Sequence, residues 1–242
     1  MTASINIVST GADVATQAAK HFLGRLSTLL ESKPEVHVVL TGGSLGIASL
    51  AAIRESTEAK SIDFTRVHFW WGDERFVASD SADRNEVQAR QALLDHLSID
   101  EAKVHPFPSS DGDLILADAK IEFTAELRTV FGAVVPAFDL VFLGMGPDGH
   151  IGSLFPGKPN PAAGELVVAE SYSPKPPPLR LSFSYEVFNA AEEVIFVVGG
   201  ADKAQAVAVA FGSSPDELPV GRVQAKKTSW FLDELAAEFI AR

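Results

Sequence analysis

The sequence predicts an α/β protein with a Rossmann-like, open and mostly parallel β-sheet that carries helices on both faces. Two observations indicate this fold. Short runs rich in β-branched residues alternate with longer segments of helical periodicity through most of the chain, which is the pattern of successive strand–helix units. Several of the short runs are also continuously apolar, as expected of strands that a parallel sheet buries on both faces.

The first half of the chain alternates predicted strands with predicted helices. Behind the first strand, apolar residues recur at every fourth position from Val14 to Leu30, which predicts an amphipathic helix. The run VHVVL that follows is short and wholly apolar apart from one histidine, and it predicts a buried strand. The strands are expected at Ile5–Ser9, Val36–Leu40 and Arg66–Trp71, and the two later helices at Leu45–Ile53 and Asn85–Leu97.

The second half continues the alternation around one irregular segment. Helices are expected at Leu116–Phe131 and Lys203–Phe211, and strands at Phe138–Gly144 and Glu193–Gly200. Prolines crowd the segment 156–184, where we expect loops that frame one or two short strands. No linker divides the chain, so residues 1–242 are predicted to form a single domain.

The composition narrows the classes of function. With 242 residues, 46% of them hydrophobic and 21% charged, the chain can bury a sizeable core. A net charge of −12 argues against a nucleic-acid partner, because phosphates demand a basic face. No apolar run approaches the roughly 18 residues of a membrane span, and no signal-peptide pattern opens the chain. The absence of cysteine suits a reducing compartment, so we expect a cytoplasmic protein without a membrane partner.

Glycine-rich or charged turns follow four of the predicted strands, and we expect them to lie along one edge of the sheet. Ligands of open α/β sheets bind beyond the carboxyl ends of the strands. The turn Thr41-Gly42-Gly43-Ser44 leads from a strand into a helix, where free N–H groups and the helix dipole favour an anion. A tight connection also uses glycine, so this turn alone does not establish a site. Neither a P-loop nor a convincing dinucleotide fingerprint is present.

One histidine differs from the others in its surroundings. His150 lies in the turn GMGPDGH at a predicted strand end, two residues after Asp148. Histidine is the common general base near neutral pH, and an adjacent carboxylate can orient its ring. The remaining histidines lie in predicted strands (His37, His68), in predicted helices (His21, His96) or in a loop (His105), and we interpret them as packing, edge, solvent-facing or capping residues.

Several cationic side chains could hold an anionic substrate against the acidic net charge. Arg75 follows Asp73 and Glu74 at a strand end, and its planar guanidinium fits a phosphate or carboxylate. Lys203 follows the turn VVGGAD, and Arg180 lies in the proline-rich segment. Each could instead be an ordinary surface charge. No spacing typical of a metal site or of a serine hydrolase occurs, so the residues indicate a phosphate-binding crevice with one histidine base and leave the reaction open.

Five segments together resemble the glucosamine-6-phosphate isomerase/6-phosphogluconolactonase family, and its lactonase branch in particular. In chain order they are LTGGS, WWGDERFV…DRN, LGMGPDGHIGSLFPG, PPPLRLSFS and GGADKAQAV, from about Val36 to Val209. The resemblance implies hydrolysis of 6-phospho-D-glucono-1,5-lactone without a metal or organic cofactor. It implies His150 as the base, oriented by Asp148, with backbone N–H groups of the surrounding glycines facing the oxyanion. The 6-phosphate would meet Gly42, Gly43 and Ser44, with Arg75 and Lys203 as cations.

Two alternatives remain open from the sequence. A hexosamine-phosphate deaminase or isomerase would use Asp73 as its base, but that branch carries a glutamate where this chain has Phe155, and a tyrosine where it has Arg75. A non-catalytic sugar-phosphate sensor would keep the pocket without turnover. The sequence also leaves open the oligomeric state and whether Asp73 and Glu74 act on the substrate or only hold Arg75.

Overall fold

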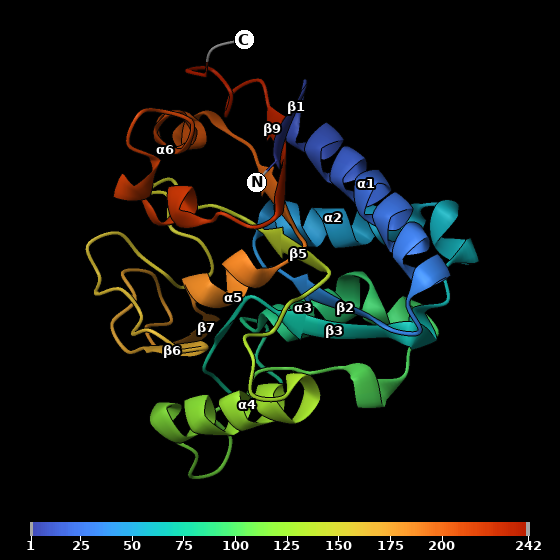
Figure 1. Ribbon diagram of the computed structural model, residues 1–242, viewed down its shortest axis with the longest axis vertical. Coiled ribbons are helices and arrows are strands. Elements are labelled where there is room, and N and C mark those ends of the chain that lie inside the picture. The colour runs from blue at the N-terminus through green and yellow to red at the C-terminus, as the bar shows by residue number, and fades with distance from the viewer. Residues whose placement is uncertain (1, 241–242) are drawn as a thin grey trace.

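A six-stranded parallel β-sheet forms the centre of the molecule (Figure 1). The structure is a computed structural model that describes residues 2–240. Every strand pair in this sheet is parallel. The predicted inner runs are buried as expected of a sheet covered on both faces, whereas the edge strand β1 leaves Ile5 and Ile7 exposed. In spatial order the strands are β1 (Thr2–Val8), β9 (Lys227–Asp233), β8 (Glu193–Val198), β5 (Leu140–Leu143), β2 (Val36–Leu40) and β3 (Val67–Trp71).

Helices cover both faces of the sheet, as the sequence predicts. The helices α1 and α2 lie on one side of the sheet, and α5 and α6 lie on the other (Figure 1). The apolar stripe of α1, including Val14, Phe22 and Leu26, is buried, and this helix packs against β8 and β9. The helices are α1 (Gly11–Ser32), α2 (Ser44–Glu55), α3 (Asn85–Ala92), α4 (Leu116–Phe131), α5 (Tyr185–Ala190) and α6 (Ala204–Ala210).

A second, antiparallel sheet of three short strands adjoins the carboxyl end of β3. It consists of β4 (Asp73–Arg75), β7 (Arg180–Phe183) and β6 (Val167–Glu170), in that order. Two short strands, β6 and β7, therefore lie within 156–184, where one or two were expected. The pairing places Arg75 opposite Arg180. These residues are far apart in the sequence, and no local sequence pattern predicts that they pair.

Some predicted boundaries are wrong, and three elements were not expected. The helix predicted for Asn85–Leu97 ends at Ala92, because Leu93 leaves the helical region with φ −141° and a 3₁₀ turn follows. The helix predicted to start at Lys203 begins at Ala204, after another 3₁₀ turn. The sequence reading did not anticipate β4, α5 or β9, although the apolar run Trp230–Leu232 in β9 is a strand signal.

The strand order locates the crevice of this sheet. The chain continues from β2 to β3 on one side, whereas from β5 it continues to β8 and β9 on the other side. The connections thus diverge between β2 and β5, and such a switch point is where open α/β sheets bind their ligands. No helix within residues 2–240 is long and apolar enough to cross a membrane.

Candidate active site

A cavity of about 320 Å³ opens at the carboxyl ends of β2, β5 and β8 and beside β4. All the predicted site residues line it except Asp148, which lies behind His150. The topology has therefore collected predicted residues from five separate parts of the chain. The predicted residues that line the cavity are Thr41, Gly42, Gly43, Ser44, Asp73, Arg75, His150, Arg180 and Lys203.

One end of the cavity is the N-terminus of α2. Gly43 is the N-cap residue and has φ +79°, a conformation that favours glycine. No side chain caps this helix, and its first turn, from Ser44 to Gly46, lines the cavity. Uncapped N–H groups and the positive end of the helix dipole make this turn suited to a phosphate.

Cationic side chains surround the same cavity. The Arg75 guanidinium donates to the carbonyl of Asp83, while its Nε is buried without a partner. Arg180 is only 5% exposed and donates to the carbonyl oxygens of residues 175, 176 and 177. The Nζ of Lys203 lies 2.6 Å from a carboxylate oxygen of Asp202. These residues place positive charge at the cavity in a protein of net charge −12.

His150 and Asp148 form a direct pair at the turn after β5. The His150 Nδ1 lies 2.5 Å from Oδ1 of Asp148. Because an ionised carboxylate only accepts hydrogen bonds, Nδ1 carries the proton and Nε2 of a neutral ring is left with its lone pair. A Cβ at Gly146 would lie 2.0 Å from the ring of His150, so glycine is required there for the turn to fold beneath the imidazole.

The surroundings of this pair keep the imidazole neutral and the carboxylate ionised. Burial lowers the pKa of His150 below its ordinary value of 6.5, although Asp148 acts in the opposite direction. Burial would raise the pKa of Asp148, but the hydrogen bond with the His150 side chain, the charge of that ring and backbone N–H groups together lower this pKa below its ordinary value. The ring is 14% exposed and can therefore reach the cavity as a base near neutral pH.

Two of the glycine N–H groups expected to face an oxyanion are already hydrogen-bonded. The N–H of Gly146 donates to the carbonyl of His150, and the N–H of Gly149 donates to the carbonyl of Gly146. Both groups are occupied within the turn itself. These two glycines therefore serve close packing of the turn rather than oxyanion binding.

Asp73 and Glu74 are adjacent in sequence but have different surroundings. Asp73 lines the cavity and accepts a hydrogen bond of 2.7 Å from Ser153 Oγ. Glu74 is 1% exposed, does not line the cavity and accepts from three backbone N–H groups. Burial raises the pKa of Glu74 to about 7, against the lowering effects of Arg84 and of those N–H groups.

The cavity also contains residues that the sequence did not mark. Asn85 is 2% exposed and donates through Nδ2 to the carbonyl oxygen of Asp73 at 2.8 Å. Lys175 adds a further cation from the proline-rich segment. Asn85 belongs to the DRN piece of the family resemblance, which was a signal for it, whereas nothing in the local sequence singles out Lys175.

Comparison with known proteins identifies the family. The chain matches the family model described as "Glucosamine-6-phosphate isomerases/6-phosphogluconolactonase" over residues 9–231. It is 40% identical to a 6-phosphogluconolactonase of Mycobacterium leprae (strain TN), and the match covers 98% of each chain. The chain belongs to the glucosamine-6-phosphate isomerase/6-phosphogluconolactonase family.

Solved structures of both branches of this family share the fold of the chain. A 6-phosphogluconolactonase from Thermotoga maritima superposes with a TM-score of 0.82 at 27% identity, covering 96% of this chain and 99% of that one. A monomeric glucosamine-6-phosphate deaminase superposes with a TM-score of 0.77 at 17% identity, covering 99% and 100%. Because the fold is common to both branches, the side chains around His150 must distinguish them.

The side chain next to His150 is apolar. Phe155 is 4% exposed, and its ring centroid lies 4.8 Å from that of His150. A phenylalanine therefore occupies the surroundings where the deaminase pattern has a glutamate. Among residues 2–240, no group of three or more histidine and acidic side chains is arranged to hold a metal ion.

Proposed function

We propose that this protein hydrolyses 6-phospho-D-glucono-1,5-lactone to 6-phosphogluconate, the 6-phosphogluconolactonase reaction of the pentose phosphate pathway, with His150 as general base. The observation that carries the mechanism is the His150–Asp148 pair. Its 2.5 Å contact occupies Nδ1 and leaves Nε2 for a water molecule in the cavity. Phe155 beside the ring favours the lactonase reaction over deamination, because it cannot supply the carboxylate of the deaminase pattern.

In the proposed reaction, His150 Nε2 takes a proton as a water oxygen attacks C1 of the lactone. The tetrahedral intermediate then collapses, and the bond between C1 and the ring oxygen breaks. The proton held by His150 passes to that oxygen, which becomes the C5 hydroxyl of 6-phosphogluconate. Asp148 holds the ring in one tautomer and stabilises the imidazolium between the two proton transfers.

The 6-phosphate is proposed to bind at the N-terminus of α2. Gly42, Gly43 and Ser44 bring backbone N–H groups to it, and Arg75 and Lys203 supply charge from two other parts of the chain. Arg180 and Thr41 complete the same lining. This arrangement offers local attraction to a dianion that the net charge of −12 repels at long range.

The decisive experiment is hydrolysis of freshly generated 6-phosphogluconolactone by wild type and by His150→Ala, with a blank that lacks enzyme. The blank is needed because the lactone also opens without a catalyst. The proposal expects strong acceleration that the substitution removes. Acceleration that survives in His150→Ala would remove this histidine from the mechanism, and no acceleration by folded wild type would refute the function.

A further inference from the structure

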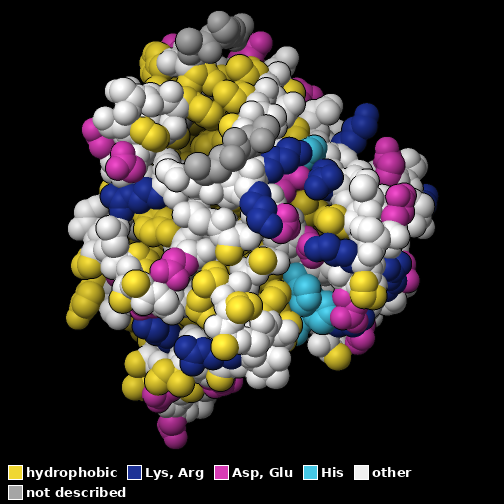
Figure 2. Space-filling view, viewed as in Figure 1, with side chains coloured by type: hydrophobic (Ala, Val, Ile, Leu, Met, Phe, Trp, Pro, Cys, Tyr) yellow, Lys and Arg dark blue, Asp and Glu magenta, His cyan; other side chains and the backbone are white. Residues whose placement is uncertain are grey.

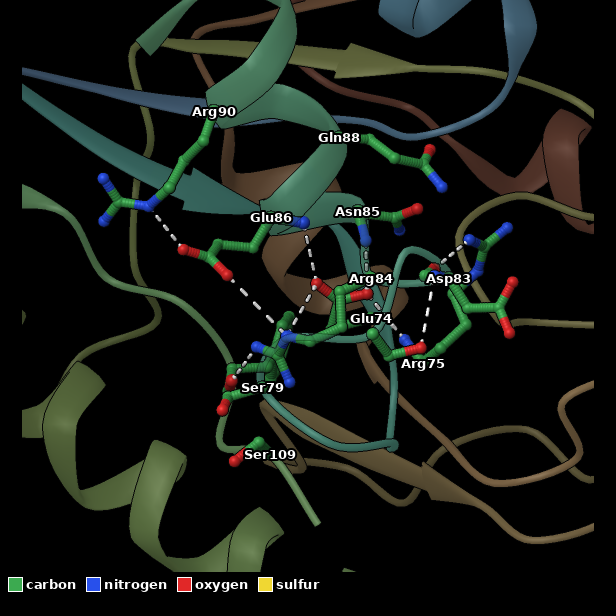
Figure 3. Close-up of polar contacts among 12 residues, drawn as sticks. Glu74, Arg75, Ser79, Asp83, Arg84, Asn85, Glu86, Gln88, Arg90 and Ser109 are labelled. Atoms are coloured by element: carbon green, nitrogen blue, oxygen red, sulfur yellow. Dashed lines mark hydrogen bonds and ion pairs between the residues drawn. The ribbon is translucent and has the colours of Figure 1, made fainter. Parts of the chain in front are cut away.

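Glu74 does not line the cavity, but its carboxylate contacts the backbone of two elements that do, β4 and α3. Its Oε1 accepts from the N–H of Arg75 at 2.8 Å and from the N–H of Asn85 at 2.7 Å. Its Oε2 accepts from the N–H of Glu86 at 2.9 Å. One carboxylate therefore joins β4 to the first turn of α3 (Figure 3), although the loop between them makes these residues distant in the chain.

The two residues that Glu74 holds, Arg75 and Asn85, both line the cavity. Asn85 extends the connection further, since its Nδ2 donates to the carbonyl of Asp73 and its Oδ1 lies against Gly42, where an added Cβ would approach it to 1.9 Å. Displacing the start of α3 would therefore disturb β4 and also the turn Thr41–Ser44, the proposed phosphate-binding turn (the phosphate turn). Glu74 itself does not line the cavity, and it contacts the lining only through the backbone N–H groups of Arg75 and Asn85.

Arg84 supplies the positive charge behind this carboxylate. It is 2% exposed, and its Nε lies 3.9 Å from Oε2 of Glu74 and 3.7 Å from Oε2 of Glu86. Its Nη2 donates to the carbonyl of Phe107 at 2.7 Å. A buried carboxylate with three N–H donors and a neighbouring guanidinium is fixed in one orientation.

We propose that Glu74 is a positioning residue for phosphate binding, acting through Arg75 and Asn85 and not through contact with the substrate. This inference rests on the proposed function, because it assigns the cavity to a sugar phosphate. Replacing the carboxyl group by an amide leaves a single acceptor oxygen, which cannot accept from all three N–H groups. The affinity for the phosphorylated substrate then falls, while His150 and Asp148, which come from another strand end, keep their geometry.

The test compares Glu74→Gln with Glu193→Gln, a matched change of another carboxylate that is 1% exposed. Glu193 begins β8, about 13 Å along the strand from Val197, where the cavity lining begins. It is held by His21, Arg25, Lys227 and Ser229. In steady-state lactone hydrolysis we expect Glu74→Gln to raise KM about 10-fold with kcat within about threefold of wild type. Glu193→Gln should leave KM unchanged, whatever its effect on the melting temperature.

Three further results decide the inference. An unchanged KM in folded Glu74→Gln, or an equal rise in Glu193→Gln, would overturn it. If Glu74→Gln does not fold, Glu74→Asp keeps the charge but is shorter by one methylene, and it must then raise KM and weaken competitive inhibition by inorganic phosphate, or the inference fails. Failure of wild type to hydrolyse the lactone would refute the proposed function instead, so the two failures are distinguishable.

Discussion

The two ends of the parallel sheet carry histidines in opposite circumstances. At the carboxyl end, His150 pairs with Asp148 through Nδ1 and keeps Nε2 free for the cavity. Toward the amino end, His37 and His68 stack at 4.2 Å between ring centroids, in register on β2 and β3. In Figure 2, most of the visible histidine surface forms one patch beside acidic and basic side chains, and a smaller histidine spot lies apart from it.

The amino-end histidines are hydrogen-bonded to neighbouring side chains. The Nδ1 of His68 lies 3.0 Å from Nε2 of His105, whose Nδ1 lies 2.7 Å from Glu126. The Trp70 indole donates to Nδ1 of His37 at 3.3 Å. Both ring nitrogens of His68 are engaged, since its Nε2 lies 3.3 Å from Glu35. Neither His37 nor His68 lines the cavity, whereas His150 does.

The largest effect that would sharpen this comparison is expected from His150→Ala. Loss of the general base should lower kcat about 10³-fold, whereas His68→Ala should leave kcat within about twofold because its ring does not line the cavity. Lactone hydrolysis corrected for the uncatalysed rate measures both variants. Comparable losses of kcat in the two folded variants would contradict the distinction drawn between the two ends of the sheet.

A smaller loss is expected from Asp148→Asn, about 10²-fold in kcat, because the ring loses the group that fixes its tautomer.

In wild type, the acidic limb of kcat/KM should lie below pH 6.5, since burial lowers the pKa of His150 and the neutral base persists to lower pH. Asp148 raises that pKa, so its removal should move the limb to still lower pH. A limb that moves upward in Asp148→Asn would exclude His150 as the titrating base.

Arg75→Ala should act mainly on substrate binding. Loss of a charged donor at the phosphate turn is expected to raise KM about 30-fold and to change kcat little, because ground state and transition state both contain the phosphate. Arg54→Ala, an exposed guanidinium near the end of α2, is the matched control and should leave KM unchanged. A fall in kcat with unaltered KM would assign Arg75 to the chemical step instead.

The sequence could predict the site because its residues follow strand ends. Parallel strands align their carboxyl ends, so turns such as the one containing Gly42 and Gly43 and the one containing His150 had to meet once the strands were recognised. The same reasoning does not reach Glu74 or Lys175. Their places depend on the antiparallel pairing of β4 with β7 and on the loop that returns to α3, and neither has a local periodicity.

The internal strand β9 was likewise not predicted from the sequence, although it belongs to the main sheet. It lies between β1 and β8, yet its first residues alternate poorly, and a long irregular segment precedes it. Its two neighbours, β1 and β8, come from other parts of the chain, and Ile5 of β1, for example, lies opposite Trp230. Propensity within a short window does not contain that information, because strand pairing is a tertiary effect.

The smallest predicted effect concerns stability and belongs to the amino-end histidines. Burial lowers the pKa of His37 to about 4, with His68 and His105 lowering it further and Asp139 and Glu35 opposing them. A histidine with a depressed folded-state pKa stabilises the protein above its unfolded pKa near 6.5, and this contribution is lost as the pH falls toward the folded value.

Between pH 6.5 and 5.5, this linkage should lower the free energy of unfolding by about 1 kcal/mol. His37→Asn removes the titration but keeps an acceptor for the Trp70 indole, so its stability should decline less over the same interval. Urea unfolding of both proteins at the two pH values measures the difference. If the free energy of unfolding falls equally with pH in both proteins, His37 is protonated as readily in the folded protein as in the unfolded chain. The contrast with His150 would then rest on hydrogen bonding alone.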